Sequence, residues 1–229
     1  MLLVAVIGSG IAASRLSPQD TGLQLFENAV ATGAALVAII LAVGPVSGAH
    51  LNPLITAIDR LYGGLSTAAA CVYVLAQLAG AALGAMIANL MFGLSAVQLS
   101  EQARTGWGLW FGEFVATLGL ALVVFGVVRS GRAAAAPFAV GAFITGAYFC
   151  TSSTSFANPA ATLGRTLSNT FAGIKPSSAP AFIAFEILGA AAAAALIWVI
   201  YPDVRDVAGR VVVPHDEPAA EASAEGASA

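Results

Sequence analysis

The chain has 229 residues, of which 59% are hydrophobic and only 9% are charged, and it contains 24 glycines. Soluble domains carry about 25% charged residues, so this composition excludes a water-soluble globule and indicates helices packed through small side chains in a lipid bilayer. A formal net charge of −3 offers no basic surface for nucleic acid. We therefore expect lipid as the surrounding partner.

Apolar stretches long enough to cross a bilayer, which takes about 20 residues per helix, recur along the chain. Six candidate spans lie between turn signals, at residues 1–16, 23–43, 67–92, 107–128, 135–150 and 180–200. The first is short, and its start shows neither the basic residues nor the cleavage site of a secretory signal. We expect this first helix to be truncated, and we assign residues 1–200 to a single membrane domain.

The composition changes after Tyr201, where proline, alanine and acidic residues replace large apolar ones. Such a segment cannot bury a core, so residues 201–229 are predicted to form a disordered acidic cytoplasmic tail. The distribution of Lys and Arg favours an orientation with both termini in the cytoplasm. The cytoplasmic group is then Arg60, Arg129, Arg132, Arg205 and Arg210, and the outer group is Arg15, Arg104, Arg165 and Lys175.

One segment of the first half recurs in the second half. SGAHLNPLITAIDRLYGG aligns with TSFANPAATLGRTLSNTFAG, which places Asn52 opposite Asn158 at an offset of 106 residues. AQLAGAALGA, from Ala76, matches FEILGAAAAA, from Phe185. Two halves with three spans each have opposite orientations in the membrane. The sequence therefore predicts an inverted repeat, with one copy at about 1–92 and the other at about 107–200.

Each Asn-Pro pair stands between two spans. Because proline favours the first turn of a helix, short helices are expected to begin at Pro53 and Pro159. The stretches that follow are too short and polar to cross lipid, so they predict half-helices around a cavity lined by protein. Their N-termini would meet near the midplane, each with roughly half a positive charge, and repel cations. The amides of Asn52 and Asn158 can donate to a passing solute oxygen.

At these residues the sequence resembles the aquaporin and glycerol facilitator superfamily, also called the major intrinsic proteins. The resemblance rests on GAHLNPLIT, SFANPAATLGR and EFVATLGLALVVFG. It implies an all-α membrane protein with six transmembrane helices plus two re-entrant half-helices in an inverted three-plus-three repeat. It also implies a homotetramer with one pore per subunit. The pore motifs implied are Asn52, Pro53 and Leu54 in the first half and Asn158, Pro159 and Ala160 in the second.

Several residues differ from the family pattern at positions that affect which solute the pore admits. Leu54 stands where the first motif usually has alanine, and Ala161 occupies the position of a pore-lining arginine in most members. Counting without gaps from the asparagines places the other contributors to the outer constriction at Thr32, Gly146 and Ser155. This set is small and uncharged, so we expect a wide constriction. The combination is similar to a bacterial branch that lacks the arginine and is associated with permeation of metalloids and arsenicals.

Several other polar residues have two candidate roles each. Arg165, four residues after Ala161, could supply charge to the outer mouth or satisfy loop carbonyls. By resemblance, His50 lines the cytoplasmic vestibule, either as a polar wall residue or as a pH gate. For Glu113 and Glu186, the resemblance implies carboxylates that brace the pore loops by accepting backbone N–H bonds, and a proton relay is the alternative.

The sequence predicts a passive channel for water and small uncharged solutes in a bacterial inner membrane, with glycerol-like solutes or neutral metalloid acids and arsenicals as candidates. A strict water channel and an ion-coupled secondary transporter are the alternatives, and the transporter would use Glu186 as its ionisable group. The two histidines and two cysteines form no catalytic or metal-binding cluster, so no enzyme activity, metal or cofactor is predicted. Cys71 and Cys150 lie in apolar runs and are expected to be buried and reduced.

Overall fold

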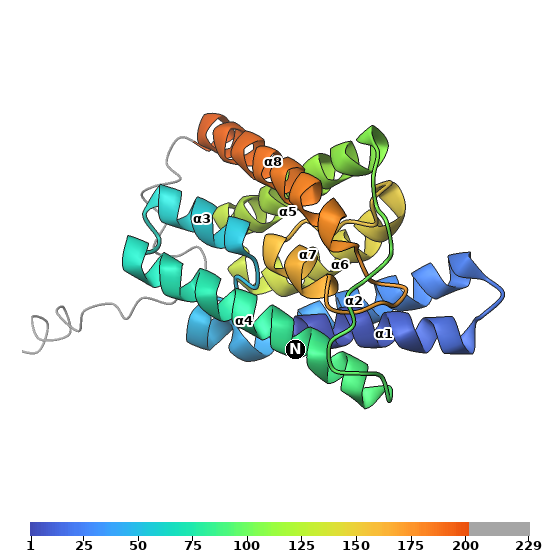
Figure 1. The fold of residues 1–229 in the computed structure, drawn as a ribbon. Coiled ribbons are helices and arrows are strands. Elements are labelled where there is room, and N and C mark those ends of the chain that lie inside the picture. Colours follow the sequence, from blue (N-terminus) through green and yellow to red (C-terminus); the bar gives the residue numbers. More distant parts are fainter. Residues whose placement is uncertain (202–229) are drawn as a thin grey trace, which may run out of the picture.

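The computed structural model describes residues 1–201, and within that range it contains helices but no strand. The expectations for the acidic tail concern residues beyond this range. Short 3-10 turns, Ala133–Ala135 and Pro176–Ser178, precede two of the helices. In the described part of the chain the α-helices (Figure 1) are α1 (Leu2–Leu16), α2 (Thr21–Ser47), α3 (Pro53–Tyr62), α4 (Thr67–Met91), α5 (Trp107–Arg129), α6 (Ala136–Cys150), α7 (Pro159–Arg165) and α8 (Ala179–Ile200).

The long helices agree with the predicted spans to within four residues at every end, and the predicted all-helical membrane fold is confirmed. Five of them, α2, α4, α5, α6 with its preceding turn, and α8 with its own, are long and apolar enough to cross a membrane. α1 has 15 residues, which at 1.5 Å per residue gives about 22 Å, less than the roughly 30 Å of a bilayer core. α3 and α7 are the two short helices that the Asn-Pro pairs predict.

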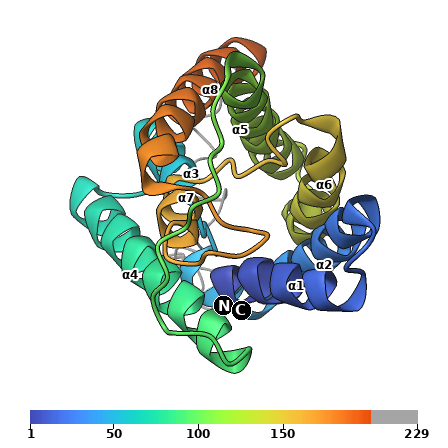
Figure 2. The same cartoon turned by 45° about the vertical axis from the view of Figure 1, so that its right-hand side comes forward.

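The six longer helices surround α3 and α7 (Figure 2). α5 packs along α8, while α2 packs against α1 and α6, and α4 packs against α1. The two halves of the chain interlock, because α7 of the second half packs against α4 of the first, and α3 of the first half packs against α8 of the second. This exchange brings the two Asn-Pro segments to the middle of the bundle.

Glycines allow helices to approach closely, both between the two halves and within the second half. A Cβ added to Gly33 of α2 would overlap the hydroxyl of Thr145 and lie 2.8 Å from the carbonyl oxygen of Gly141, both in α6. A Cβ added to Gly189 of α8 would overlap the carbonyl oxygen of Phe114 in α5. Helices in lipid associate mainly through close packing of small residues, since lipid tails are as apolar as leucine.

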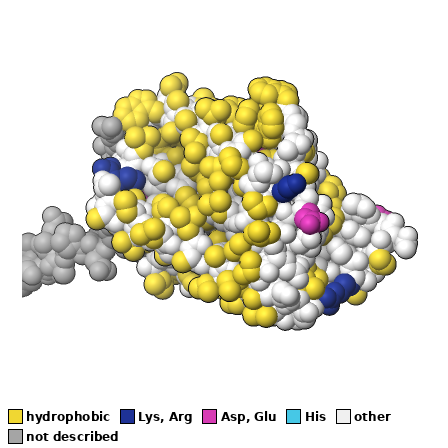
Figure 3. Space-filling view, in the orientation of Figure 1, with side chains coloured by type: hydrophobic (Ala, Val, Ile, Leu, Met, Phe, Trp, Pro, Cys, Tyr) yellow, Lys and Arg dark blue, Asp and Glu magenta, His cyan; other side chains and the backbone are white. Residues whose placement is uncertain are grey.

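The surface between the two ends of the bundle is apolar. Hydrophobic side chains cover most of the face shown in Figure 3, and the charged side chains on that face lie toward its two ends. Such a surface suits contact with lipid chains. Cys71 and Cys150 are free thiols on the exposed surface, so the expectation that both are buried is wrong. Each cysteine faces outward from its helix, where a thiol is apolar enough to contact lipid.

Candidate pore

Asn52 and Asn158 begin the two half-helices. Both have an extended backbone, with φ of −151° and −162°, and the side-chain oxygen of each accepts N–H groups of the first helical turn. Oδ1 of Asn52 accepts from Leu54 N at 2.9 Å, and Oδ1 of Asn158 accepts from Ala160 N at 3.1 Å. Proline follows each asparagine, at a position where its missing N–H has no helical partner to lose. The Asn-Pro pairs thus fix where both half-helices start.

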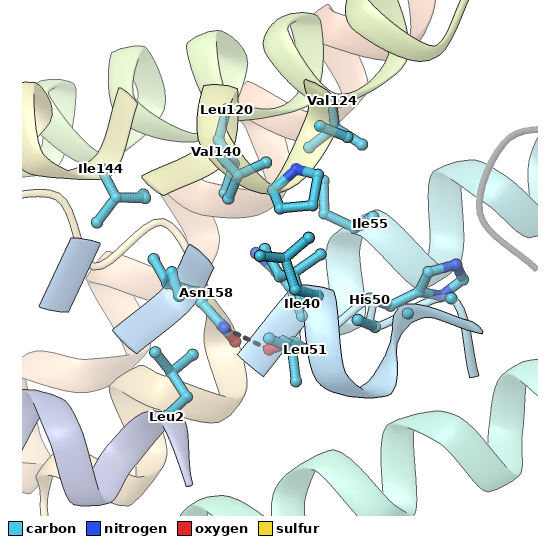
Figure 4. A pocket seen from close by; sticks show the side chains of 18 of the residues that line it. Leu2, Ile40, His50, Leu51, Ile55, Leu120, Val124, Val140, Ile144 and Asn158 are labelled. Carbon is cyan, nitrogen blue, oxygen red and sulfur yellow. Dashed lines mark hydrogen bonds between the residues drawn. The ribbon is translucent and has the colours of Figure 1, made fainter. Parts of the chain in front are cut away.

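The same asparagines join the two loops to each other. Nδ2 of Asn52 donates to the carbonyl of Ala157 at 2.7 Å, and Nδ2 of Asn158 donates to the carbonyl of Leu51 at 2.8 Å. Figure 4 shows the second of these bonds. Each accepting residue directly precedes the other asparagine in the sequence. The N-terminal ends of α3 and α7 are therefore held together, and each amide keeps a second N–H that these bonds do not use.

The backbone before each asparagine has the same unusual conformation in both halves. Ala49 and Leu51 in the first loop, and Ser155 and Ala157 in the second, have φ between +48° and +53°. Non-glycine residues rarely adopt this left-handed region, which costs roughly 1–3 kcal/mol each. The residues of each pair lie three and one positions before their asparagine. The carbonyls of Leu51 and Ala157 accept the asparagine amides, which offsets part of this cost.

A cavity of about 630 Å³, the main cavity, lies beside the joined loops. Asn52 and Asn158 belong to its lining, and none of the described residues that line it is Asp, Glu, Lys or Arg. Across from Asn158 and Leu51 the wall is apolar (Figure 4), and it consists there of Leu120, Val124, Val140 and Ile144. A second cavity of about 380 Å³ lies between α1 and α4 and shares Asn158 with the first.

The structure places three of the four inferred constriction residues at or beside the main cavity and corrects the fourth. Ser155 and Ala161 belong to the lining. Thr32 is buried behind it, with its hydroxyl 3.2 Å from that of Tyr148, which does line the cavity. Gly146 is instead exposed on the side of α6 away from Ile144 and Tyr148, which line the cavity, and an added Cβ there would meet nothing within 4 Å. Two residues rotate a helix by about 200°, so a count that ignores the length of the α6–α7 loop selects the wrong face.

Glu113 and Glu186 are fully buried and bind different parts of the second half-helix segment. The two carboxylate oxygens of Glu113 accept the backbone N–H groups of Phe156 and Ala157, at 2.9 and 2.7 Å. Oε1 of Glu186 accepts the hydroxyl of Thr162 in α7 at 2.6 Å. Glu113 thus has the bracing geometry that the resemblance implies, and Glu186 binds the half-helix itself through a side-chain hydroxyl. Neither carboxylate belongs to the lining of the main cavity.

Arg165 is buried and does not belong to the lining of either cavity. Its Nε donates to the carbonyl of Ala172, and its guanidinium carbon lies 3.3 Å from the centroid of the Phe156 ring. This geometry matches the second hypothesis for Arg165, hydrogen bonding to loop carbonyls. Arg104, which the sequence predicts only as a charge on the outer side, donates to the carbonyls on both sides of Ala172.

Comparison with known proteins decides the family. Residues 1–155 match the family described as major intrinsic protein. The chain belongs to this family. It is 45% identical over 203 residues to aquaglyceroporin AqpS of Rhizobium meliloti (strain 1021), covering 88% of this chain and 86% of that protein. It is 31% identical over 205 residues to aquaporin-5 of Sus scrofa, covering 82% and 74%. The solved aquaglyceroporin from Plasmodium falciparum has the same fold, with a TM-score of 0.66 at 21% identity, covering 89% of this chain and 93% of that one.

As a major intrinsic protein, the chain is a membrane channel for water and small solutes and not an enzyme. The family match includes the first asparagine motif but ends before Asn158. The second motif is recognised in the structure by its reciprocal hydrogen bond with the first loop. Within residues 1–201, no group of three or more His, Cys, Asp or Glu side chains is placed to hold a metal ion.

His50 of this major intrinsic protein ties the first loop to α3. Its Nδ1 lies 3.0 Å from Thr56 Oγ1, and its Nε2 lies 3.5 Å from a carboxylate oxygen of Asp59. The ring, which is fully buried, also lies 5.4 Å from the ring of Tyr73 in α4. The sequence-based prediction of site residues does not include Asp59. The available signal is that Asp59 is the only acidic residue between Pro53 and Tyr62.

Proposed function

We propose that the main cavity is the solute pathway of this channel, and that it admits glycerol-like solutes and neutral metalloid acids, including arsenicals, as well as water. The observation that carries the proposal is the uncharged lining of a cavity of about 630 Å³. Ala161 contributes a methyl group at the position where the family resemblance implies an arginine. Because pore selectivity follows the diameter and the groups that line the pore, this lining favours solutes larger than water.

The chemistry of the wall suits solutes that are polar but uncharged. Asn52 and Asn158 each have an amide N–H, not used between the loops, that can donate to a solute hydroxyl. The opposite wall is apolar and includes Leu120 and Ile144, which can contact the carbon side of the same solute. The N-terminal ends of α3 and α7 meet at the polar wall, and their positive dipole ends raise the barrier for cations.

At the level of the proposed outer constriction, the small residues Ser155 and Ala161 share the lining with two aromatic side chains, Tyr148 and Phe156. The Tyr148 hydroxyl lies 3.2 Å from that of Thr32 in α2. This contact holds the phenol ring along the wall, because α2 packs directly against α6. We therefore assign the width of the constriction to Tyr148, in place of the Gly146 position.

We further propose that residues 1–200 form one channel domain with repeats at 1–92 and 107–200, that the channel is a homotetramer, and that both termini are cytoplasmic in a bacterial inner membrane. The bacterial source of aquaglyceroporin AqpS supports the location. Contacts support the grouping of Arg15, Arg104 and Lys175 on one side of the membrane. Arg15 donates to the carbonyl of Phe92 at the end of α4, Arg104 donates to the carbonyl of Gly173, and the backbone N–H of Lys175 donates to the carbonyl of Gln102 in the loop after α4.

Stopped-flow light scattering of proteoliposomes tests this proposal with water, glycerol, urea and arsenite. We expect glycerol and arsenite to enter much faster than into empty liposomes, without saturation and without dependence on a proton gradient. Rapid entry of water alone would identify a strict water channel and overturn the proposed solute range. Saturable entry driven by a proton gradient would instead indicate a coupled transporter.

A further inference from the structure

Two arginine side chains lie behind the wall of the main cavity. Phe156 belongs to the lining, and the guanidinium carbons of Arg165 and Arg104 lie 3.3 and 5.1 Å from the centroid of its ring. The ring also packs against Phe182 of α8, with the centroids 5.1 Å apart, which fixes its position. Both positive charges are therefore separated from the cavity by about the thickness of one buried side chain.

Backbone carbonyls, rather than carboxylates, satisfy these two guanidinium groups. Arg104 donates to Gly173 at 2.9 Å and to Phe171 at 3.2 Å, and Arg165 donates to Ala172, so three successive carbonyls of one loop are used. Among residues 1–201, no carboxylate oxygen lies within 4.0 Å of either guanidinium. Carbonyl dipoles provide hydrogen-bond acceptors but carry no net charge, so both unit charges persist.

The buried carboxylates on the same side of the bundle have other hydrogen-bond partners. Glu113 accepts the N–H groups of Phe156 and Ala157, and Glu186 accepts the hydroxyl of Thr162. Neither forms an ion pair with an arginine in the described structure. At Phe156 the Glu113 carboxylate therefore binds the backbone N–H, whereas the charged groups that lie over the ring itself are the guanidinium groups of Arg104 and Arg165.

We propose that Arg104 and Arg165 exclude cations from the pore through the Phe156 wall, and so supply from outside the lumen the charge that Ala161 lacks inside it. This inference rests on the proposed role of the main cavity as the solute pathway. A guanidinium inside the lumen would repel cations and also occupy space, whereas one behind a ring repels cations and leaves the opening wide. At an effective dielectric constant of about 20 and a distance of roughly 10 Å, the repulsion from one unit charge lowers the rate at which a monovalent cation passes through the pore by about tenfold or somewhat more.

The test compares Arg104→Gln with Arg104→Lys, because lysine keeps the charge but loses the forked hydrogen bonds. The measured quantity is the ratio of potassium to glycerol permeability in the same proteoliposomes. We expect Arg104→Gln to raise this ratio about tenfold and Arg104→Lys to leave it within about twofold of the wild-type value. The matched control is Arg15→Gln. Arg15 also lies over a phenylalanine, at 5.2 Å, and donates to a carbonyl, but Phe92 does not line the main cavity.

An unchanged ratio in Arg104→Gln would overturn the inference, and so would an equal rise in Arg104→Lys, which would assign the effect to loop geometry rather than charge. If the Arg104→Gln variant does not fold, the potassium permeability of the wild-type channel tests the inference instead. Potassium entry above that of empty liposomes would contradict exclusion through the wall. A wild-type channel that passes no glycerol would contradict the proposed solute pathway instead, and its potassium permeability would still report on the charges.

Discussion

The side-chain amide of Asn52 donates to the carbonyl of Ala157 over 2.7 Å, and so joins two segments that lie 105 residues apart in the chain. The reciprocal bond from Asn158 to Leu51 makes the junction symmetrical. Both asparagines also cap their own half-helices. The same two side chains therefore set the start of the short helices, hold the two halves together and present amide groups to the main cavity.

We predict that Asn52→Asp lowers glycerol and water permeability by at least about tenfold. The aspartate keeps the oxygen that caps α3, but it replaces the donor to Ala157 with a second acceptor, which leaves a buried carbonyl unpaired at a cost of about 1–3 kcal/mol. Proteoliposome flux at equal protein content is the measurement. Asn169→Asp is the control, because Asn169 is exposed and uses only its side-chain oxygen, which aspartate retains. Equal flux in wild type and Asn52→Asp would contradict the role of the junction.

We predict that Glu113→Gln lowers the free energy of unfolding by about 1–3 kcal/mol. Both oxygens of Glu113 accept loop N–H groups, and a glutamine offers one acceptor and points an NH₂ group at the other donor. Glu186→Gln is the matched comparison and should cost less, since one acceptor is enough for the Thr162 hydroxyl. Denaturation in detergent measures both variants. A larger loss for Glu186→Gln would contradict the bracing role assigned to Glu113.

The close approach of α2 and α6 predicts that Gly33→Ala is destabilising. The added methyl would overlap Thr145 and crowd the carbonyl of Gly141, and overpacking of this kind costs about 1–3 kcal/mol. Gly146→Ala in α6 meets nothing within 4 Å and should change the stability by less than about 1 kcal/mol. Thermal unfolding of the two variants in the same detergent is the measurement, and equal melting temperatures would count against this packing.

Tyr148 provides a direct test of the proposed constriction. We predict that Tyr148→Ala raises the ratio of glycerol to water permeability several-fold, because the phenol ring is the largest side chain on the wall near Ser155 and Ala161. Gly146→Ala should leave the same ratio unchanged, since Gly146 faces away from the cavity. Stopped-flow rates for both solutes give the ratio. If Gly146→Ala changes this permeability ratio and Tyr148→Ala does not, the constriction would lie at Gly146 and not at Tyr148.

The helices whose position is set by neighbouring residues in the chain could be predicted from the sequence. The long apolar runs predict the membrane helices, and the Asn-Pro pairs predict the starts of α3 and α7, because proline and a capping asparagine act within one helical turn. The repeat also predicts that Asn52 and Asn158 are equivalent. Family resemblance adds the bracing role of Glu113, and the structure places its carboxylate on the loop.

Features that depend on the path of a loop could not be predicted in this way. Counting without gaps selects Gly146, whereas Tyr148 lines the cavity. The count assumes a fixed loop length, and nothing in that loop's composition reveals which face of α6 turns inward. The left-handed conformations of Leu51 and Ala157 are equally hidden, since neither residue type favours positive φ. Arg104 was noted only as a charge on the outer side, because its partners lie about 70 residues away.

The central claim is that an uncharged, wide constriction admits neutral solutes larger than water, and Ala161→Arg tests it most directly. The measurement is the initial rate of glycerol and arsenite entry into proteoliposomes, alongside water, for wild type and variant. We expect the wild type to pass all three solutes, and the variant to retain water flux while losing at least about tenfold in glycerol and arsenite flux. A wild-type channel that passes only water, or a variant as permeable to glycerol as the wild type, would contradict the claim.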